Sequence, residues 1–256
     1  YVSKDDRLKY EESKNKIFDL IISNTSYDYD DSYLKHAVFI NTVAHLVKTP
    51  SKLSIITTNY DTLIEDAADS IGFTVIDGFT FAHRPQFDSD MFEWNLVKDI
   101  ENIKTRELEY KKNIINLLKL HGSLTWERND NRIYRKDKSD VKNPIMIFPS
   151  SNKYMQSYQE PYFELFVKFQ ELLKRPNTLL ITTGFSFADN HISQMIMQAI
   201  LHNKSLALLI SDYNINQENE NWIRLQDLMQ HNYQIAFLKA TMNSDLVDYL
   251  GEHYDD

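Results

Sequence analysis

Apolar residues recur at helical spacing through most of the first fifty positions. In the first run these residues are Leu8, Tyr10, Ile17, Leu20 and Ile21. After an acidic break at 28–31, a second run extends from 37 to 46. Steps of three and four residues are typical of an amphipathic helix. Pro50 ends the pattern, because the residue before a proline is steered away from the α conformation. We therefore expect residues 1–50 to form a helical N-terminal insertion.

From residue 53 onward, short apolar runs alternate with stretches of helical spacing. We interpret as strands the runs Leu53–Thr57, Phe73–Ile76, Leu117–Leu120, Ile145–Phe148, Leu179–Thr183, Leu206–Ile210 and Ile235–Leu238. The helical stretches are Tyr60–Ile71, Tyr162–Leu173, Ile192–Leu201, Trp222–Met229 and Leu246–Leu250. This alternation predicts an α/β fold with a Rossmann-like, mostly parallel sheet covered by helices on both faces. The segment from Phe87 to Asn116 lacks a clear pattern, and we expect a surface insertion there.

Length and composition limit the class of protein. A chain of 256 residues fits a single domain, here 1–256, with the insertion at 1–50 and the Rossmann-like core at 51–256. The formal charge of −9 argues against direct nucleic-acid binding, which usually needs a basic surface. The chain has no cysteine, which excludes disulfides and thiolate zinc sites. We expect no metal, no membrane segment and a bacterial cytoplasmic location.

Three polar clusters follow predicted strands. They are Thr57-Thr58-Asn59-Tyr60-Asp61, Leu120-His121-Gly122-Ser123-Leu124 and the segment from Gly184 to Ile192. In open α/β sheets, ligands bind beyond the carboxyl ends of the strands. We therefore expect the three clusters to meet in one crevice, although they are far apart in sequence.

The residue types in these clusters suit a nucleotide. The imidazole of His121 can act as a general base near neutral pH, and the amide of Asn59 can orient a hydroxyl or a water. A glycine–serine turn at the start of a helix offers N–H groups to ribose or phosphate. The pattern Gly-x-Ser-x-Gly of serine hydrolases is absent.

Structural explanations exist for each cluster taken alone. Asn59 and Asp61 could cap the helix that follows them, and Asp189 could cap the next one. His121 could be a satisfied histidine in a turn. The functional interpretation depends on all three clusters occurring in order, each at the end of a strand.

These motifs resemble those of the sirtuin superfamily. The first cluster resembles its Thr-Gln-Asn-Ile-Asp motif, Leu120–Ser123 its catalytic-histidine motif, and Gly184-Phe185-Ser186 its Gly-Thr-Ser turn. Further strings resemble the bacterial antiphage branch that hydrolyses NAD⁺, and within it the subunit paired with HerA-type ATPases. They are Gly78-Phe79-Thr80, Tyr110 through Trp126, Pro149 through Tyr154, and Gly184–Ile192.

The resemblance implies an NAD⁺ hydrolase, with NAD⁺ as substrate and no bound cofactor. Asn59 and His121 would be catalytic, and Asp61 would bind the nicotinamide carboxamide. Gly184 and Ser186 would hold the adenosine side. The full set of residues implied in nucleotide binding is Thr57, Thr58, Asp61, Gly122, Gly184, Phe185, Ser186 and Asp212.

Departures from the family pattern refine this expectation. Sirtuin deacylases carry a four-cysteine zinc ribbon, which a chain without cysteine lacks, so water is expected as the acceptor in place of an acyl group. Thr58 and Phe185 replace the family's glutamine and threonine. The Gly-Ala-Gly-x-Ser loop that cradles the pyrophosphate is not in these residues, and we expect it upstream of Tyr1.

The resemblance also implies a homo-oligomer that works with a hexameric HerA-type ATPase and depletes NAD⁺ in abortive antiphage defence. Three alternatives remain open. A non-catalytic NAD⁺ or ADP-ribose sensor would bind without turnover. A nuclease component would need a divalent metal, and a deacylase would turn over acyl-lysine.

Overall fold

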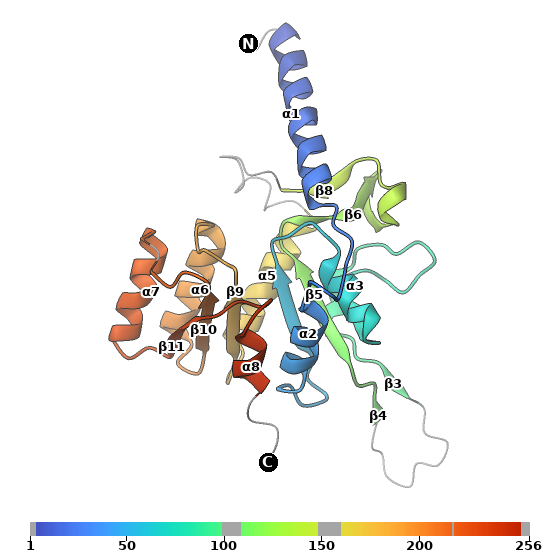
Figure 1. The fold of residues 1–256 in the computed structure, drawn as a ribbon. Coiled ribbons are helices and arrows are strands. Elements are labelled where there is room, and N and C mark those ends of the chain that lie inside the picture. The colour runs from blue at the N-terminus through green and yellow to red at the C-terminus, as the bar shows by residue number, and fades with distance from the viewer. Residues whose placement is uncertain (1–3, 99–108, 148–159, 217, 252–256) are drawn as a thin grey trace.

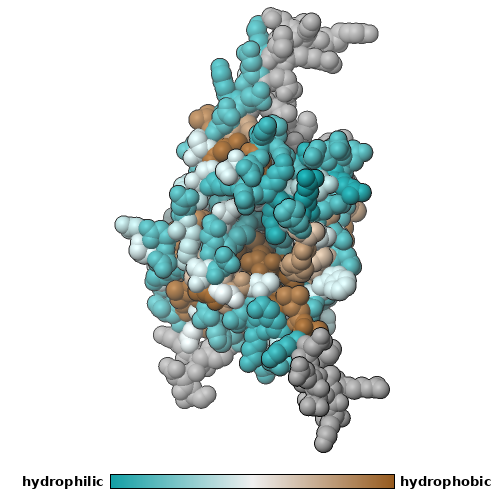
Figure 2. Space-filling model, turned by 90° about the vertical axis from the view of Figure 1, so that its right-hand side faces the viewer, coloured by the Kyte–Doolittle hydropathy of each residue, from teal (hydrophilic) through white to brown (hydrophobic). Residues whose placement is uncertain are grey.

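The computed structural model describes residues 4–98, 109–147, 160–216 and 218–251. Helix α1 (Lys4–Thr25) projects from the body of the molecule (Figure 1), whereas α2 (His36–Ala44) packs against the helices at 63–70 and 246–251. The side of the molecule shown in Figure 2 is largely hydrophilic, with hydrophobic residues in smaller groups. The predicted helical region at the N-terminus is confirmed.

Two three-stranded parallel sheets form the centre of the fold. The first has the order β1-β5-β2, and the second β11-β10-β9. Their strands are β1 (Leu53–Thr57), β2 (Thr74–Ile76), β5 (Ile114–Lys119), β9 (Leu179–Thr183), β10 (Ala207–Asp212) and β11 (Ile235–Lys239). In Figure 1 the two sheets lie beside each other, with β1 and β9 as the neighbouring edges. The prediction of an α/β fold with Rossmann-like parallel strands and no zinc ribbon is confirmed.

Helices cover both faces of the sheets. They are α3 (Leu63–Ser70), α5 (Tyr162–Lys174), α6 (Asn190–His202), α7 (Glu220–Gln230) and α8 (Leu246–Gly251). Every residue of β5 is buried. Leu118 joins the core beneath α5, whereas Ile115 joins a second cluster with α2 and α3. Because successive side chains of a strand point to opposite faces, burial of every position shows that β5 is a central strand.

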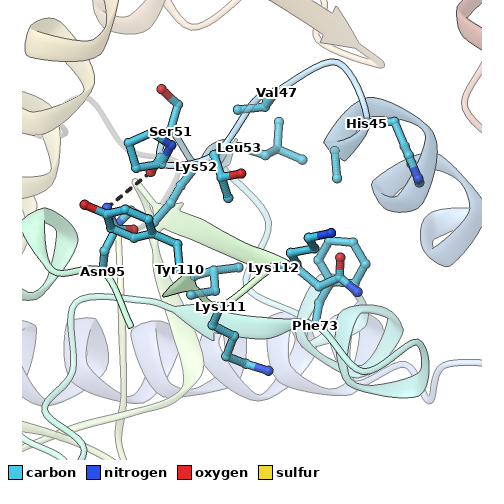
Figure 3. Close-up of a pocket in the computed structure, with 15 residues that line it drawn as sticks. His45, Val47, Ser51, Lys52, Leu53, Phe73, Asn95, Tyr110, Lys111 and Lys112 are labelled. Carbon is cyan, nitrogen blue, oxygen red and sulfur yellow. Dashed lines mark hydrogen bonds between the residues drawn. The ribbon is translucent and has the colours of Figure 1, made fainter. Parts of the chain in front are cut away.

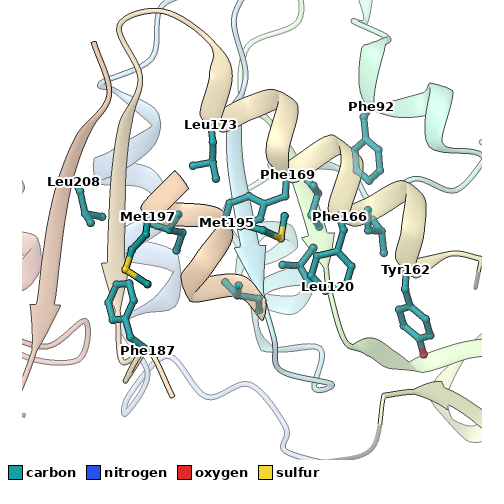
Figure 4. Packing of buried hydrophobic residues seen from close by; sticks show 14 of the residues in the cluster. Phe92, Leu120, Tyr162, Phe166, Phe169, Leu173, Phe187, Met195, Met197 and Leu208 are labelled. Atoms are coloured by element: carbon teal, nitrogen blue, oxygen red, sulfur yellow. The ribbon is translucent and has the colours of Figure 1, made fainter. Parts of the chain in front are cut away.

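Aromatic residues of α5 form the centre of the larger core. Phe166 and Phe169 extend from α5 toward Leu120, close to Met195 of α6 (Figure 4). Tyr162, at the start of α5, is also buried, and burial raises the pKa of its hydroxyl well above the ordinary value. This packing fixes α5 and α6 against the end of β5, where one of the polar clusters begins.

A cavity separates the two parallel sheets. It measures about 280 Å³, and its lining includes every residue of β1 and of β9. Phe39 of α2 and Ile196 of α6 also line it. Among the described residues, β1 pairs with β5 and β9 with β10, so each strand has one edge facing this cavity. The hydroxyl of Thr182, on β9, is buried and has no hydrogen-bond partner in the described part of the chain.

Two sequence predictions were wrong. The run Ile145–Phe148 was assigned with the parallel strands, but β8 (Pro144–Met146) pairs antiparallel with β6 (Gly122–Asn129). That sheet also contains β7 (Arg132–Arg135), in the order β7-β6-β8.

The segment from Phe87 to Asn116 is more than a surface insertion. Phe87, Met91 and Phe92 are buried in the core around the short helix η1 (Ser89–Glu93). The segment then forms the antiparallel pair β3 (Val97–Lys98) and β4 (Glu109–Tyr110), and its last residues begin β5. Buried aromatic residues spaced irregularly in a loop carry no period, which is why the pattern did not reveal them. In the described residues, no helix is long and apolar enough to cross a membrane.

Candidate functional site

The polar clusters lie at the carboxyl ends of β1, β5 and β9. Thr57 pairs with Lys119 in register, so Asn59 and His121 both lie two residues beyond the last pair. The cavity between the sheets is lined at this end by Thr57, Thr58, Asn59, Gly184 and Phe185. The structure therefore brings residues of the first and third clusters to one cavity, and it places the histidine cluster on the strand beside the first.

The loop after β1 is held by local hydrogen bonds. The backbone N–H of Asn59 donates to Oγ1 of Thr57 at 3.1 Å, and the Asn59 side chain is exposed. Asp61 is buried, and its Oδ1 accepts from the N–H of Leu63 at 3.1 Å, where α3 begins. Asp61 thus shapes the turn before α3, but the residue at the N-cap is Thr62, which makes no side-chain cap hydrogen bond. The hydroxyl of Tyr60 donates to the carbonyl oxygen of Ile147 at 2.6 Å, which ties this loop to the chain after β8.

His121 lies where β5 turns into β6. Its carbonyl oxygen accepts from the N–H of Ile147 at 2.8 Å, and the residue is buried. Gly122 has φ of +92°, and a Cβ at this position would lie 2.0 Å from the carbonyl oxygen of Ile145. A side chain cannot fit against backbone at that distance, so the close approach of β8 requires glycine directly after the histidine.

Asp189 contacts two parts of the site. Its Oδ1 accepts from the N–H groups of His191 and Ile192, at 3.1 and 3.3 Å, and so caps α6. Its Oδ2 lies 3.5 Å from Nε2 of His121. The helix cap predicted from the sequence is confirmed, but the contact with His121 was not predicted.

The turn after β9 has a left-handed glycine. Gly184 has φ of +62°, and its N–H donates to the carbonyl oxygen of Ser211 at 3.3 Å. The hydroxyl of Ser186 accepts from the N–H of Ala188 at 3.4 Å, and the ring of Phe185 lies 4.8 Å from that of Phe187. Ser186 is exposed and Phe185 half-buried, so the turn presents one polar and one apolar side chain.

Asp212 ends β10, the strand next to β9. It is buried, and its Oδ1 accepts from the N–H of Asn214 at 2.9 Å. Its carboxylate therefore shapes the turn after β10, close to the Gly184 turn because Gly184 bonds to Ser211.

Two histidines near the site were missed by sequence reasoning. Burial lowers the pKa of His36, whereas the charge of Asp61 opposes this shift. Its Nδ1 is buried and has no hydrogen-bond partner among the described residues. Burial also lowers the pKa of His191, with Asp189 opposing and His121 adding to the effect, and its ring lies 4.5 Å from Phe166. His36 lies in α2 and follows no strand, so the criterion used for the sequence could not find it, whereas His191 lies within the third cluster and was given no role of its own there.

A separate pocket of about 290 Å³ lies at the amino ends of β1 and β5 (Figure 3). Lys52, Lys111 and Lys112 are among its lining residues. Burial, with the nearby charges of Arg175 and Lys168, lowers the pKa of Lys52 to about 8. None of the three polar clusters reaches this pocket. Within the described ranges, no group of three or more His, Asp or Glu side chains is arranged to hold a metal ion.

Comparison with known proteins identifies one family. Residues 53–238 match the SIR2-like domain family, a range that contains all three polar clusters and Asp212. No curated protein matches the chain. The string from Pro149 through Tyr154, part of the resemblance seen in the sequence, lies outside the described residues.

Proposed function

The chain belongs to the SIR2-like domain family, whose members act on NAD⁺, and we propose on that premise that it hydrolyses the nicotinamide–ribose bond of NAD⁺. Water adds to the anomeric carbon of the ribose as the bond to nicotinamide breaks. The products are nicotinamide, ADP-ribose and one proton. The nicotinamide ring is already cationic in NAD⁺, so the bond electrons neutralise it and no strong general acid is required.

The observation that carries the proposal is the placement of Asn59 and His121 on neighbouring strand ends, where Asn59 and Gly184 line one cavity. In the proposed reaction Asn59 orients the ribose or the attacking water, and His121 accepts a proton from a ribose hydroxyl or from water. Asp61 binds the nicotinamide carboxamide. Thr57, Thr58, Gly122, Gly184, Phe185, Ser186 and Asp212 form the surrounding nucleotide site.

The composition of the chain supports water as the acceptor. A deacylase needs a cleft that presents acyl-lysine to the ribose, and the zinc ribbon that helps build this cleft in sirtuins is excluded by the absence of cysteine. The site then has to stabilise an oxocarbenium-like ribose and admit water.

The proposal includes a glycine-rich strand that completes the sheet between β1 and β9 and cradles the pyrophosphate. The cavity lined by both strands supports it, because the edges that face the cavity carry backbone groups able to pair with one more parallel strand. A protein extended upstream of Tyr1 by such a strand should exchange the amide hydrogens of β1 and β9 more slowly than residues 1–256 do. Unchanged exchange would contradict this part of the proposal.

The biological role we propose is depletion of NAD⁺ in the cytoplasm of a phage-infected bacterium. The protein would act as a homo-oligomer under the control of a hexameric HerA-type ATPase. Support comes from the strings at 119–126 and 184–192, which resemble the ATPase-paired branch. Controlled activity is expected because continuous hydrolysis of NAD⁺ would kill the host.

The test is nicotinamide release from NAD⁺ by the full-length protein, with and without the ATPase. Asn59→Ala and His121→Ala should each abolish release. His231→Ala serves as control, because this histidine is largely exposed at the end of α7 and remote from the site. Tight NAD⁺ binding without release under any condition would replace the hydrolase with a sensor. Metal-dependent DNA cleavage that survives His121→Ala would replace it with a nuclease.

A further inference from the structure

The two carboxylate oxygens of Asp189 contact different groups, one at the start of helix α6 and the other on the ring of His121. Oδ1 accepts from two N–H groups in the first turn of α6, those of His191 and Ile192. Oδ2 lies 3.5 Å from Nε2 of His121. The side chain of Asp189 is 14% exposed and that of His121 11%, so little water competes for this contact.

Two backbone donors restrict how the carboxylate can turn. A carboxylate at a helix N-terminus is also stabilised in its charged form by the helix dipole. Asp189 therefore presents an acceptor at a fixed position, and one ring nitrogen of His121 lies against it, while its charge also acts on the neighbouring His191.

A neutral imidazole carries its proton on one nitrogen and a lone pair on the other, and the hydrogen bond made by one nitrogen decides which. A carboxylate beside Nε2 favours the tautomer with the proton on Nε2. The lone pair then lies on Nδ1, which becomes the nitrogen able to accept a proton. The same carboxylate stabilises the imidazolium that forms afterwards, as an aspartate does in hydrolase triads.

The two residues belong to different parts of the fold. His121 follows β5 of one parallel sheet, whereas Asp189 precedes α6 beside the other. The backbone of His121 is fixed through its carbonyl oxygen by Ile147, which leaves the ring free to rotate about its side-chain bonds unless another group holds it. Asp189 places a carboxylate in contact with that ring.

We propose that Asp189 is a positioning residue that holds His121 with its proton on Nε2, so that Nδ1 accepts the proton from a ribose hydroxyl or water. The expected effect on the reaction rate rests on the proposed hydrolysis. The assignment of the His121 tautomer does not depend on it. Nδ1 gains the proton as the hydroxyl or water loses it, and the proton passes to solvent after the product leaves.

Asp189→Asn separates positioning from capping. Asparagine caps helices as well as aspartate does, so α6 should keep its start. The neutral amide no longer favours a proton on Nε2. The ring of His121 is observed by NMR in protein labelled with ¹³C and ¹⁵N histidine, and its signals are assigned by their loss in His121→Gln. The wild type should show the Nε2–H tautomer, and Asp189→Asn should reduce its population.

Nicotinamide release should fall about 100-fold or more in kcat in Asp189→Asn, with KM changed less than about threefold. Asp245→Asn is the matched control, because the Asp245 carboxylate accepts from the N–H of Thr241 just before α8, and this variant should leave the tautomer and kcat unchanged. An unchanged tautomer in Asp189→Asn would overturn the inference and leave Asp189 as a helix cap. A changed tautomer in a protein that releases no nicotinamide would support positioning while refuting the hydrolase.

Discussion

Lys119 donates a hydrogen bond from Nζ to the backbone carbonyl oxygen of Asp61. It is 1% exposed, and it also pairs with Glu65 of α3 at 3.0 Å. Lys119 precedes His121 by two residues, and Asp61 follows Asn59 by two. One buried lysine therefore joins the two strand ends that carry the proposed catalytic residues.

Lys119→Met should cost about 3–5 kcal/mol of unfolding free energy, because removal of one partner leaves the carboxylate of Glu65 without its cation. Urea unfolding followed by circular dichroism measures this loss. The double variant Lys119→Met/Glu65→Leu should recover part of it. Lys111→Met is the matched control, because Lys111 is exposed. Equal losses of unfolding free energy in Lys119→Met and Lys111→Met would contradict the role given to Lys119.

Gly122→Ala should destabilise the protein by more than about 3 kcal/mol, because the new Cβ would meet the backbone of Ile145 and the positive φ adds strain. Gly72→Ala is the control. Gly72 also has a positive φ, of +73°, but its Cβ would have nothing within 4 Å, so we expect a cost of about 1 kcal/mol. Thermal unfolding of both variants makes the comparison. Similar melting temperatures would show that β8 does not approach Gly122 closely.

Acid should destabilise the protein through His36 and His191. Burial lowers the pKa of both histidines in the folded state below the ordinary value of 6.5. The unfolded chain therefore binds protons that the folded chain does not, and stability falls as the pH drops from 6.5 toward the lowered pKa values. Urea unfolding at pH 7.5, 6.5 and 5.5 gives this slope. His36→Gln and His191→Gln should each flatten it, whereas His231→Gln should not.

Asn221→Ala should weaken the turn after β9. Asn221 of α7 is buried, and its Nδ2 donates to the carbonyl oxygen of Phe187 at 2.9 Å and to Oδ1 of Asn190 at 2.7 Å. Phe187 has φ of +58°, so this contact supports a strained residue inside the 184–189 segment. We expect a loss of about 1–3 kcal/mol and weaker NAD⁺ binding, measured by calorimetry. Asn216→Ala, at an exposed position, should change neither quantity.

The sequence predicted the strands and helices of the parallel sheets closely. β1 and β9 have the predicted bounds, because each is a continuous apolar run that ends at polar residues or glycine. The helices from α5 onward also lie within two residues of their predicted bounds. In these segments the secondary-structure preference of the residues and their burial favour the same element, so the hydrophobic pattern alone is enough to predict it.

The hairpin β6–β7 was missed although its signal is present. Leu124, Trp126 and Ile133 are buried, and the two strands are joined by Asp130-Asn131, with Asp130 at φ of +53°. Alternating apolar residues on either side of such a two-residue turn are typical of a hairpin. The charged residues at 127–132 obscured it.

The contact between His121 and Asp189 could not have been predicted. It depends on where α6 packs beside the end of β5. The spacing of apolar residues along the chain predicts helices and strands but not how they pack together. Sequence reasoning correctly identified each residue as the end of an element, but their meeting is a property of the packed core around Phe166 and Phe169.

The cavity between β1 and β9 also bears on how the two parallel sheets are held relative to each other. Among the described residues β1 pairs with β5 and β9 with β10, so no ladder of backbone hydrogen bonds links one sheet to the other. Asn59 lines the cavity from one sheet and Gly184 from the other. The spacing of these two residues is therefore set by the packing of helix side chains such as Phe39 and Ile196, and by the strand proposed to lie between them.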